Sequence, residues 1–132
     1  MRNFNLQIAT PDGLRFSGEA ESLLVRTADG DVEVLFGHTE LLASLITGRV
    51  RIKVEGKDRF ASASGGFLSV TKDGVKLVTT TFEFADEIDL ARAEKARETA
   101  EELLKSAVDD NALRSAEAKL ARSLSRIKVA KM

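Results

Sequence analysis

The sequence predicts an antiparallel β sandwich or barrel followed by an antiparallel two-helix hairpin. All nine Gly, the one Pro and all seven Phe precede residue 85, whereas residues 86–132 lack these three types and are rich in Ala, Leu, Glu, Lys and Arg. Apolar residues alternate with polar ones in the first part and recur about every 3.6 residues in the second. Turn formers and aromatic residues are typical of strands, and Ala, Leu and Glu of helices. We therefore divide the chain into residues 1–85 and 86–132.

The first part is predicted to consist of many short strands. Residues 3–8 and 49–54 alternate between apolar and polar side chains, so each segment has one apolar and one solvent-exposed face. Short turn signals containing Gly and Asp separate the apolar segments and leave no room for crossover helices, which favours antiparallel pairing. Residues 41–46 are compatible with either a strand or a short helix.

The second part is predicted to form two helices. Asp89 is suited to cap the first helix, which continues at helical spacing to Ala107. Residues 108–111 interrupt the pattern, and Asp110 or Asn111 is suited to cap the second helix. Its apolar residues recur at intervals of three and four and form one stripe: Leu113, Ala116, Leu120, Leu124 and Ile127. The short connection predicts an antiparallel hairpin.

Charge is distributed unevenly within the hairpin. The chain has a net charge of −1, but residues 86–110 carry nine acids and four bases, and residues 111–132 carry one acid and six bases. These segments therefore sum to −5 and +5, which favours their closure, although exposed ion pairs each contribute under about 1 kcal/mol. The Ala-rich stripe buries little apolar area, so the hairpin alone is marginally stable. We expect it to dock on the sandwich or on a partner.

Composition and motifs exclude several function classes. The absence of Cys excludes thiolate metal sites and cysteine nucleophiles, and no other cluster suits a metal. The near-neutral charge argues against a nucleic-acid partner, and no apolar run approaches the roughly 20 residues of a membrane helix. His38 is the only His, and the sequence contains no nucleophile motif that would accompany it in a catalytic site. We therefore favour a turn His that makes a local hydrogen bond or a partner contact. We predict no catalytic residue.

One group of charged residues suits an anionic ligand. Arg92 lies in the first turn of the first predicted helix, and Arg122 and Arg126 share a face of the second. In an antiparallel hairpin all three converge near Asp89, and guanidinium groups suit phosphate, so a nucleotide is one hypothesis. The alternative, favoured on geometry alone, is that these Arg pair with acids of the neighbouring helix. Those acids are Asp86, Glu87 and Asp89.

The whole chain resembles the epsilon subunit of the F-type ATP synthase. The similarity is carried, in order, by residues 6–13, 16–19, 30–38, 65–67, 88–93 and 122–130. The family typically has Gly-Ile-Leu-Pro-Gly-His where this chain has Glu33-Val-Leu-Phe36-Gly-His38, so Glu33 replaces a Gly and Phe36 a Pro. This loop helps to form the contact surface for partners, and we expect it to have a different shape here.

The resemblance implies a ten-stranded β sandwich and a helical hairpin on the central stalk of the synthase. The implied partners are the gamma subunit and the c-ring for the sandwich, and the beta subunits for the hairpin. The implied function is that of a non-catalytic rotor subunit that couples the c-ring to gamma. The resemblance implies that the form with the hairpin folded down couples, and that the form with the hairpin extended restrains ATP hydrolysis. Asp31 would face the c-ring loops and His38 would lie near gamma. The implied location is the cytoplasmic face of the bacterial plasma membrane, held only through the complex.

The resemblance also implies a regulatory ligand. Some bacterial members bind ATP in the folded hairpin, and this chain keeps the matching residues: Ile88, Asp89, Arg92, Ala93, Arg122 and Arg126. Nucleotide-binding members carry further Arg where this chain has Thr99 and Leu103, and the loss of one phosphate-facing guanidinium costs on the order of 1 to 3 kcal/mol. No cofactor is required, and ATP is a candidate ligand. The alternative function is a stand-alone ATP-sensing module whose hairpin closes on ATP.

Overall fold

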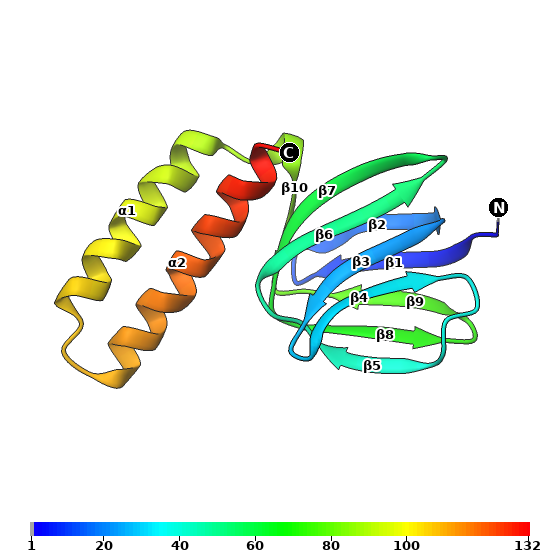
Figure 1. Ribbon diagram of the computed structural model, residues 1–132, viewed down its shortest axis with the longest axis horizontal. Coiled ribbons are helices and arrows are strands. Elements are labelled where there is room, and N and C mark those ends of the chain that lie inside the picture. Colours follow the sequence, from blue (N-terminus) through cyan, green and yellow to red (C-terminus); the bar gives the residue numbers. More distant parts are fainter. Residues whose placement is uncertain (1) are drawn as a thin grey trace.

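The computed structural model describes residues 2–132 and contains a β sandwich followed by two helices (Figure 1). The predicted fold class is confirmed. The strands are β1 (Phe4–Thr10), β2 (Gly13–Ala20), β3 (Ser22–Thr27), β4 (Gly30–Leu35), β5 (Leu41–Ser44), β6 (Gly48–Val54), β7 (Lys57–Ser64), β8 (Phe67–Thr71), β9 (Gly74–Val78) and β10 (Thr81–Phe84). A 3₁₀ turn, η1 (Ala85–Glu87), then leads to α1 (Leu90–Ser106) and α2 (Asp110–Ala130).

The strands form two five-stranded sheets. Sheet A has the order β2-β1-β9-β8-β5, and sheet B has the order β10-β7-β6-β3-β4. All pairs are antiparallel except β1 with β9, which run parallel with Leu6 opposite Val75 and Ile8 opposite Leu77. This one pair departs from the predicted antiparallel arrangement, because alternation of apolar residues specifies a face but not a pairing direction. Residues 41–44, which the sequence left ambiguous, form the edge strand β5.

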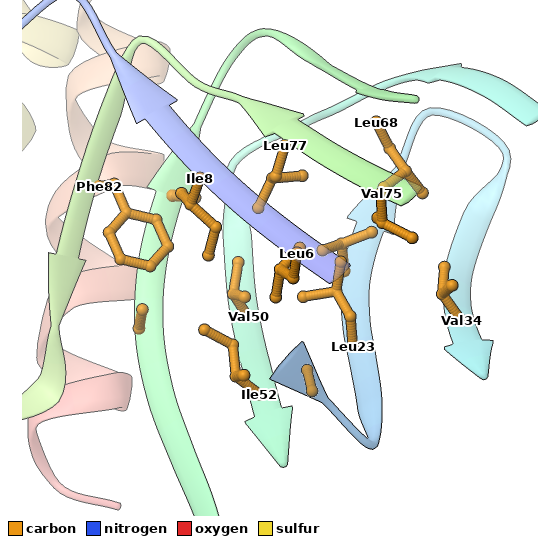
Figure 2. Close-up of a cluster of buried hydrophobic side chains, with 14 of the residues drawn as sticks. Leu6, Ile8, Leu23, Val34, Val50, Ile52, Leu68, Val75, Leu77 and Phe82 are labelled. Atoms are coloured by element: carbon orange, nitrogen blue, oxygen red, sulfur yellow. The ribbon is translucent and has the colours of Figure 1, made fainter. Parts of the chain in front are cut away.

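The core lies between the two sheets (Figure 2). Its inward side chains come from alternate positions of the strands, and the eight that follow are at most 2% exposed. They are Leu6, Ile8, Leu68 and Leu77 of sheet A and Leu23, Val34, Val50 and Ile52 of sheet B. Burial of one such side chain contributes about 1.5 to 3 kcal/mol, so the sandwich carries most of the hydrophobic stabilisation of the chain.

The turn between β7 and β8 depends on glycine. Gly66 has a φ of +96°, and a Cβ placed on it would lie 1.8 Å from the carbonyl oxygen of Val78. Both the backbone angle and the close approach of a neighbouring backbone therefore exclude a side chain. Gly37, after β4, has a φ of +80° with no atom within 4 Å of the same ideal Cβ position. Only the backbone angle favours glycine there.

The two helices form the predicted antiparallel hairpin (Figure 1). Asp89 caps α1, as predicted, by accepting a hydrogen bond of 3.1 Å from a backbone N–H of the first turn. Asp109 caps α2 in the same way at 2.7 Å, so the predicted caps Asp110 and Asn111 are wrong. The helix begins one residue earlier, since three consecutive polar residues can all serve as caps and only the path of the connection selects one.

Small residues occupy the buried face of the hairpin. Ala93, Ala100, Ala116 and Ser123 are at most 3% exposed. Within the predicted apolar stripe of α2, by contrast, Leu113 and Leu124 are 38% and 47% exposed. Small side chains allow two helices to approach closely, and larger ones are then displaced to the rim of the contact.

The hairpin packs against sheet B through α2, which contacts β6 and β7 (Figure 1). Three polar residues lie in register across the strands on this face, Glu83 of β10, Ser62 of β7 and Arg49 of β6, and we call them the docking row. The Oγ atoms of Ser62 and Ser125 lie 2.7 Å apart, and Arg126 Nε lies 2.6 Å from a carboxylate oxygen of Glu83. The sandwich is thus a surface on which the hairpin docks.

Glu87 fixes the connection between the sandwich and the hairpin. Its carboxylate accepts the backbone N–H of Phe84 at 2.9 Å and the guanidinium of Arg15 at 2.6 and 2.8 Å. Arg15 belongs to β2 of sheet A, whereas Phe84 ends β10 of sheet B. One carboxylate therefore joins the two sheets where the chain leaves them. Within residues 2–132, neither helix has the length and apolar character needed to cross a membrane.

Candidate functional site

A basic groove runs between α1 and α2. It has a volume of about 370 Å³ and is lined by five basic side chains and no acid. The basic residues are Arg92, Lys95, Lys119, Arg122 and Arg126. The floor includes Ala96 and the fully buried Ala100, whose small side chains leave room above them. Both helices contribute cations, so the groove exists only while the hairpin is closed.

A second groove, of about 360 Å³, adjoins the first and shares Arg92, Ala96 and Arg126 with it. It is lined in addition by Ile88 and Ala93 together with three carboxylates, Glu83, Glu87 and Asp89. We call it the acidic groove. All six residues predicted to bind a nucleotide therefore line one of the two grooves. Ala93 is 3% exposed and forms part of the wall.

The ion pairs of these residues differ from the alternative inferred from the sequence. Arg126 pairs with Glu83 on β10 and not with an acid of the neighbouring helix. Glu87 pairs with Arg15, and Asp89 accepts a backbone N–H at the start of α1. The alternative pairing is thus wrong: Glu87 and Asp89 are engaged elsewhere, and Asp86 forms no ion pair within 4.0 Å among the described residues. Among residues 2–132, Arg92 and Arg122 form no ion pair within 4.0 Å.

This arrangement suits a ligand with phosphate at one end. Unpaired guanidinium and ammonium groups in the basic groove match phosphate oxygens, and carboxylates in the acidic groove accept hydrogen bonds from an amino group. Thr99 and Leu103, where nucleotide-binding members of the family carry Arg, both line the basic groove. The substitutions therefore fall on the wall of the candidate site.

The two predicted partner-contact residues lie at opposite ends of β4. Asp31 is the second residue of this strand, forms an ion pair with Arg26 at 3.6 Å and lines a groove beside α2. His38 follows the strand and donates from Nδ1 to the carbonyl oxygen of Thr39 at 2.7 Å. Because they lie at different ends of the sandwich, the two residues do not form one site.

An exposed apolar strip crosses the outer face of sheet A. Leu14, Ala9, Val78 and Phe67 lie in register across β2, β1, β9 and β8, and Leu42 lies on the same face of β5, two residues from Ser44, the register partner of Phe67. Leu14, Phe67 and Leu42 are 61%, 42% and 73% exposed. Alternation in these strands directs their other apolar side chains into the core, so the strip is a second, separate apolar surface. Exposed apolar surfaces are often used for contacts with other proteins.

Reasoning from the sequence missed the apolar strip, both Lys of the basic groove and Glu83. The strip joins residues from five strands, so it depends on the sheet order and leaves no local signal. Lys95 is different, because it lies three residues after Arg92 and four before Thr99 on the predicted helix. Helical spacing alone could have placed it beside the predicted arginines.

Two family models match the chain. Residues 3–85 match the model described as ATP synthase, Delta/Epsilon chain, beta-sandwich domain, and residues 86–131 match the long alpha-helix domain of the same chain. Relatives named ATP synthase epsilon chain include one from Ruminococcus albus, 37% identical over 98% of both chains, and one from Bacillus subtilis, 40% identical over 86% of both. These names are those of a subunit, which agrees with the prediction of a non-catalytic chain.

Two solved structures are similar over nearly the whole chain. A chain of the Euglena gracilis mitochondrial ATP synthase, in a structure of its OSCP/F1/c-ring part, has a TM-score of 0.84 at 25% identity and is matched over 82% of its length. A chain in the central stalk and c-ring of the Tetrahymena thermophila enzyme has a TM-score of 0.65 at 13% identity, which bears on the fold alone. From the two family models and the full-length relatives, the chain belongs to the ATP synthase delta/epsilon chain family.

Proposed function

We propose that the chain is a non-catalytic subunit of the central stalk of an ATP synthase, bound to its partner through the apolar strip of sheet A. The strip is the observation that carries the proposal. It exposes three large apolar side chains on a face that the hairpin leaves uncovered, since the hairpin packs on sheet B. Burying these side chains against the gamma subunit would remove apolar area from water at about 25 cal/mol per Å².

The test is co-expression with the cognate gamma subunit. The variant Leu42→Glu places a charge at the β5 end of the proposed contact, on an edge strand where the side chain is 73% exposed and contributes little to folding. We expect Leu42→Glu to abolish co-purification with gamma. The control Val108→Glu makes the same kind of change at a residue that is 91% exposed in the α1–α2 connection, far from sheet A. Equal recovery of gamma with both variants would refute the proposed contact.

The hairpin is the proposed regulatory part. It is held to the sandwich by few polar contacts, namely the Ser62–Ser125 contact and the Arg126–Glu83 ion pair, so a modest free energy would exchange this docking for contacts with the beta subunits. The c-ring would then contact the end of the sandwich that bears Asp31, at the cytoplasmic side of a bacterial plasma membrane. The chain itself would reach the membrane only through the complex.

ATP is the proposed ligand of the closed hairpin, with its phosphates in the basic groove and its base in the acidic groove. Calorimetry of the isolated chain tests this assignment with Arg92→Ala and Arg122→Ala, for which we expect at least tenfold weaker binding. The control Arg97→Ala removes a guanidinium that pairs with Glu101 outside both grooves. Equal heats of ATP binding for the wild type and all three variants would refute the proposed site.

The stand-alone ATP sensor remains the second candidate function, favoured by the two grooves. It differs from the subunit in one respect, because it assigns no partner to the apolar strip. Co-purification of gamma with the wild-type chain and its loss in Leu42→Glu would therefore decide between the two functions.

A further inference from the structure

The basic groove extends beyond the residues that the family motif supplies. Arg92 and Arg126 lie where the two grooves meet, near the sandwich. Lys95 and Thr99 follow along α1, and Lys119 precedes Arg122 on the antiparallel α2. The cations are therefore spread along the groove, and Lys95 and Lys119 continue it away from the acidic groove.

The two Lys also differ from Arg126 in their neighbours. Arg126 is held at 2.6 Å by Glu83, which offsets part of its charge. Within residues 2–132, neither Lys95 nor Lys119 has a carboxylate within 4.0 Å, and no acid lines the groove beside them. Their ammonium groups are thus free to bind an anion, and each one offers three donors on a flexible chain.

Thr99 lies between these two positions. It is exposed on the groove wall, and its hydroxyl donates to the backbone carbonyl of Lys95 at 3.1 Å. The threonine hydroxyl is therefore satisfied within its own helix and adds no positive charge. The positive charge at this part of the groove comes from Lys95 on one helix and Lys119 on the other.

We propose that Lys95 and Lys119 bind the terminal phosphate of a nucleoside triphosphate and set the preference of the site for triphosphate over monophosphate. This inference rests on the proposed ATP site and assigns two further residues to it. A ligand whose base lies in the acidic groove and whose first phosphate meets Arg92 and Arg126 extends its phosphate chain along the helices toward the two Lys. Their positive charges take the place of the Arg side chains that nucleotide-binding members of the family carry at the positions of Thr99 and Leu103.

Calorimetry on the full chain, at fixed salt and without magnesium, tests the assignment with ATP and AMP. For the double variant Lys95→Ala and Lys119→Ala we expect about tenfold weaker binding of ATP and unchanged binding of AMP. Both Lys are exposed and Ala favours helix, so the variant folds. The matched control, Lys105→Ala with Lys128→Ala, removes one Lys from each of the same helices outside the groove.

Each outcome has a defined meaning. Loss of ATP affinity in the groove variant alone, with AMP affinity retained, supports the assignment. The same loss in groove and control variants would mean that only overall charge matters, and it would overturn the inference while leaving the ATP site in place. Absence of ATP binding by the wild-type chain would overturn the proposed site itself, and the inference with it.

Discussion

Removing one hydroxyl of the Ser62–Ser125 contact should weaken the docking of the hairpin on the sandwich by a measurable amount. Ser62 is 7% exposed, and its Oγ lies 2.7 Å from that of Ser125. Replacing Ser125 by Ala leaves a buried hydroxyl without its partner, which costs about 1 to 2 kcal/mol. Because each 1.4 kcal/mol is a factor of ten, the population with the hairpin detached should rise about 5- to 30-fold.

Removing both hydroxyls should cost less than removing one. In the double variant Ser62→Ala and Ser125→Ala two apolar groups face each other and no buried donor or acceptor is left over, so we expect docking close to that of the wild type. The coupling free energy of the cycle should therefore be at least about 1 to 2 kcal/mol in magnitude. Alanine at position 125 also raises helix propensity by up to about 0.5 kcal/mol, but this contribution occurs in both variants and cancels.

Energy transfer between two introduced cysteines reports the detached population. The chain contains no Cys, so Lys72→Cys in the β8–β9 turn and Ala118→Cys on the exposed side of α2 carry the only labels. Ser115→Ala, the same substitution at an exposed position of α2, is the control. A detached population within twofold of the wild type in Ser125→Ala, or single effects that simply add in the double variant, would refute the reasoning.

Three further predictions concern other parts of the molecule. Gly66→Ala should lower the free energy of unfolding by more than about 3 kcal/mol and Gly37→Ala by about 1 kcal/mol, because of the two only Gly66 has a backbone oxygen in the space of a Cβ. Urea denaturation measures both losses, and equal losses would contradict this explanation. Glu83→Gln breaks the ion pair with Arg126, whose side chains are about one-third exposed, so the detached population should rise two- to fivefold in the same energy-transfer assay. The detached population of this variant should no longer depend on salt concentration, and an unchanged salt dependence would contradict a role of the ion pair in docking. Thr99→Arg should tighten ATP binding about fivefold in calorimetry, and weaker binding would place the phosphates elsewhere.

Local patterns in the sequence were sufficient to predict the two parts of the chain and most of the groove. Alternation predicted the strands, and the absence of Gly, Pro and aromatic residues after residue 85 predicted the helices. Helical spacing placed Arg92, Arg122 and Arg126 at one end of the hairpin, where the structure has them. These features depend on residues close together in the chain or on one simple pairing of helices.

Features that depend on the order of the strands could not be predicted in the same way. The partner of Arg126 is Glu83 of β10, and two of the acids suggested by the sequence, Glu87 and Asp89, instead bind Arg15 and cap α1. The apolar strip exists only because β2, β1, β9, β8 and β5 are neighbours in that order. Several orders are compatible with the same alternation, so the outer face of a sheet is known only once the pairing is known.

The parallel pairing of β1 with β9 also sets an order of events during synthesis of the chain. β2 can pair with β1 as soon as both have emerged, since two residues separate them, but the other edge of β1 has no neighbour until residues 74–78 exist. A nascent chain that ends earlier exposes a bare strand edge, which favours aggregation. Glu83 of the docking row is made later still. The docking row on sheet B is therefore complete only after the opposite sheet, A, can close, and a product truncated before residue 74 lacks both the β1–β9 pair and Glu83.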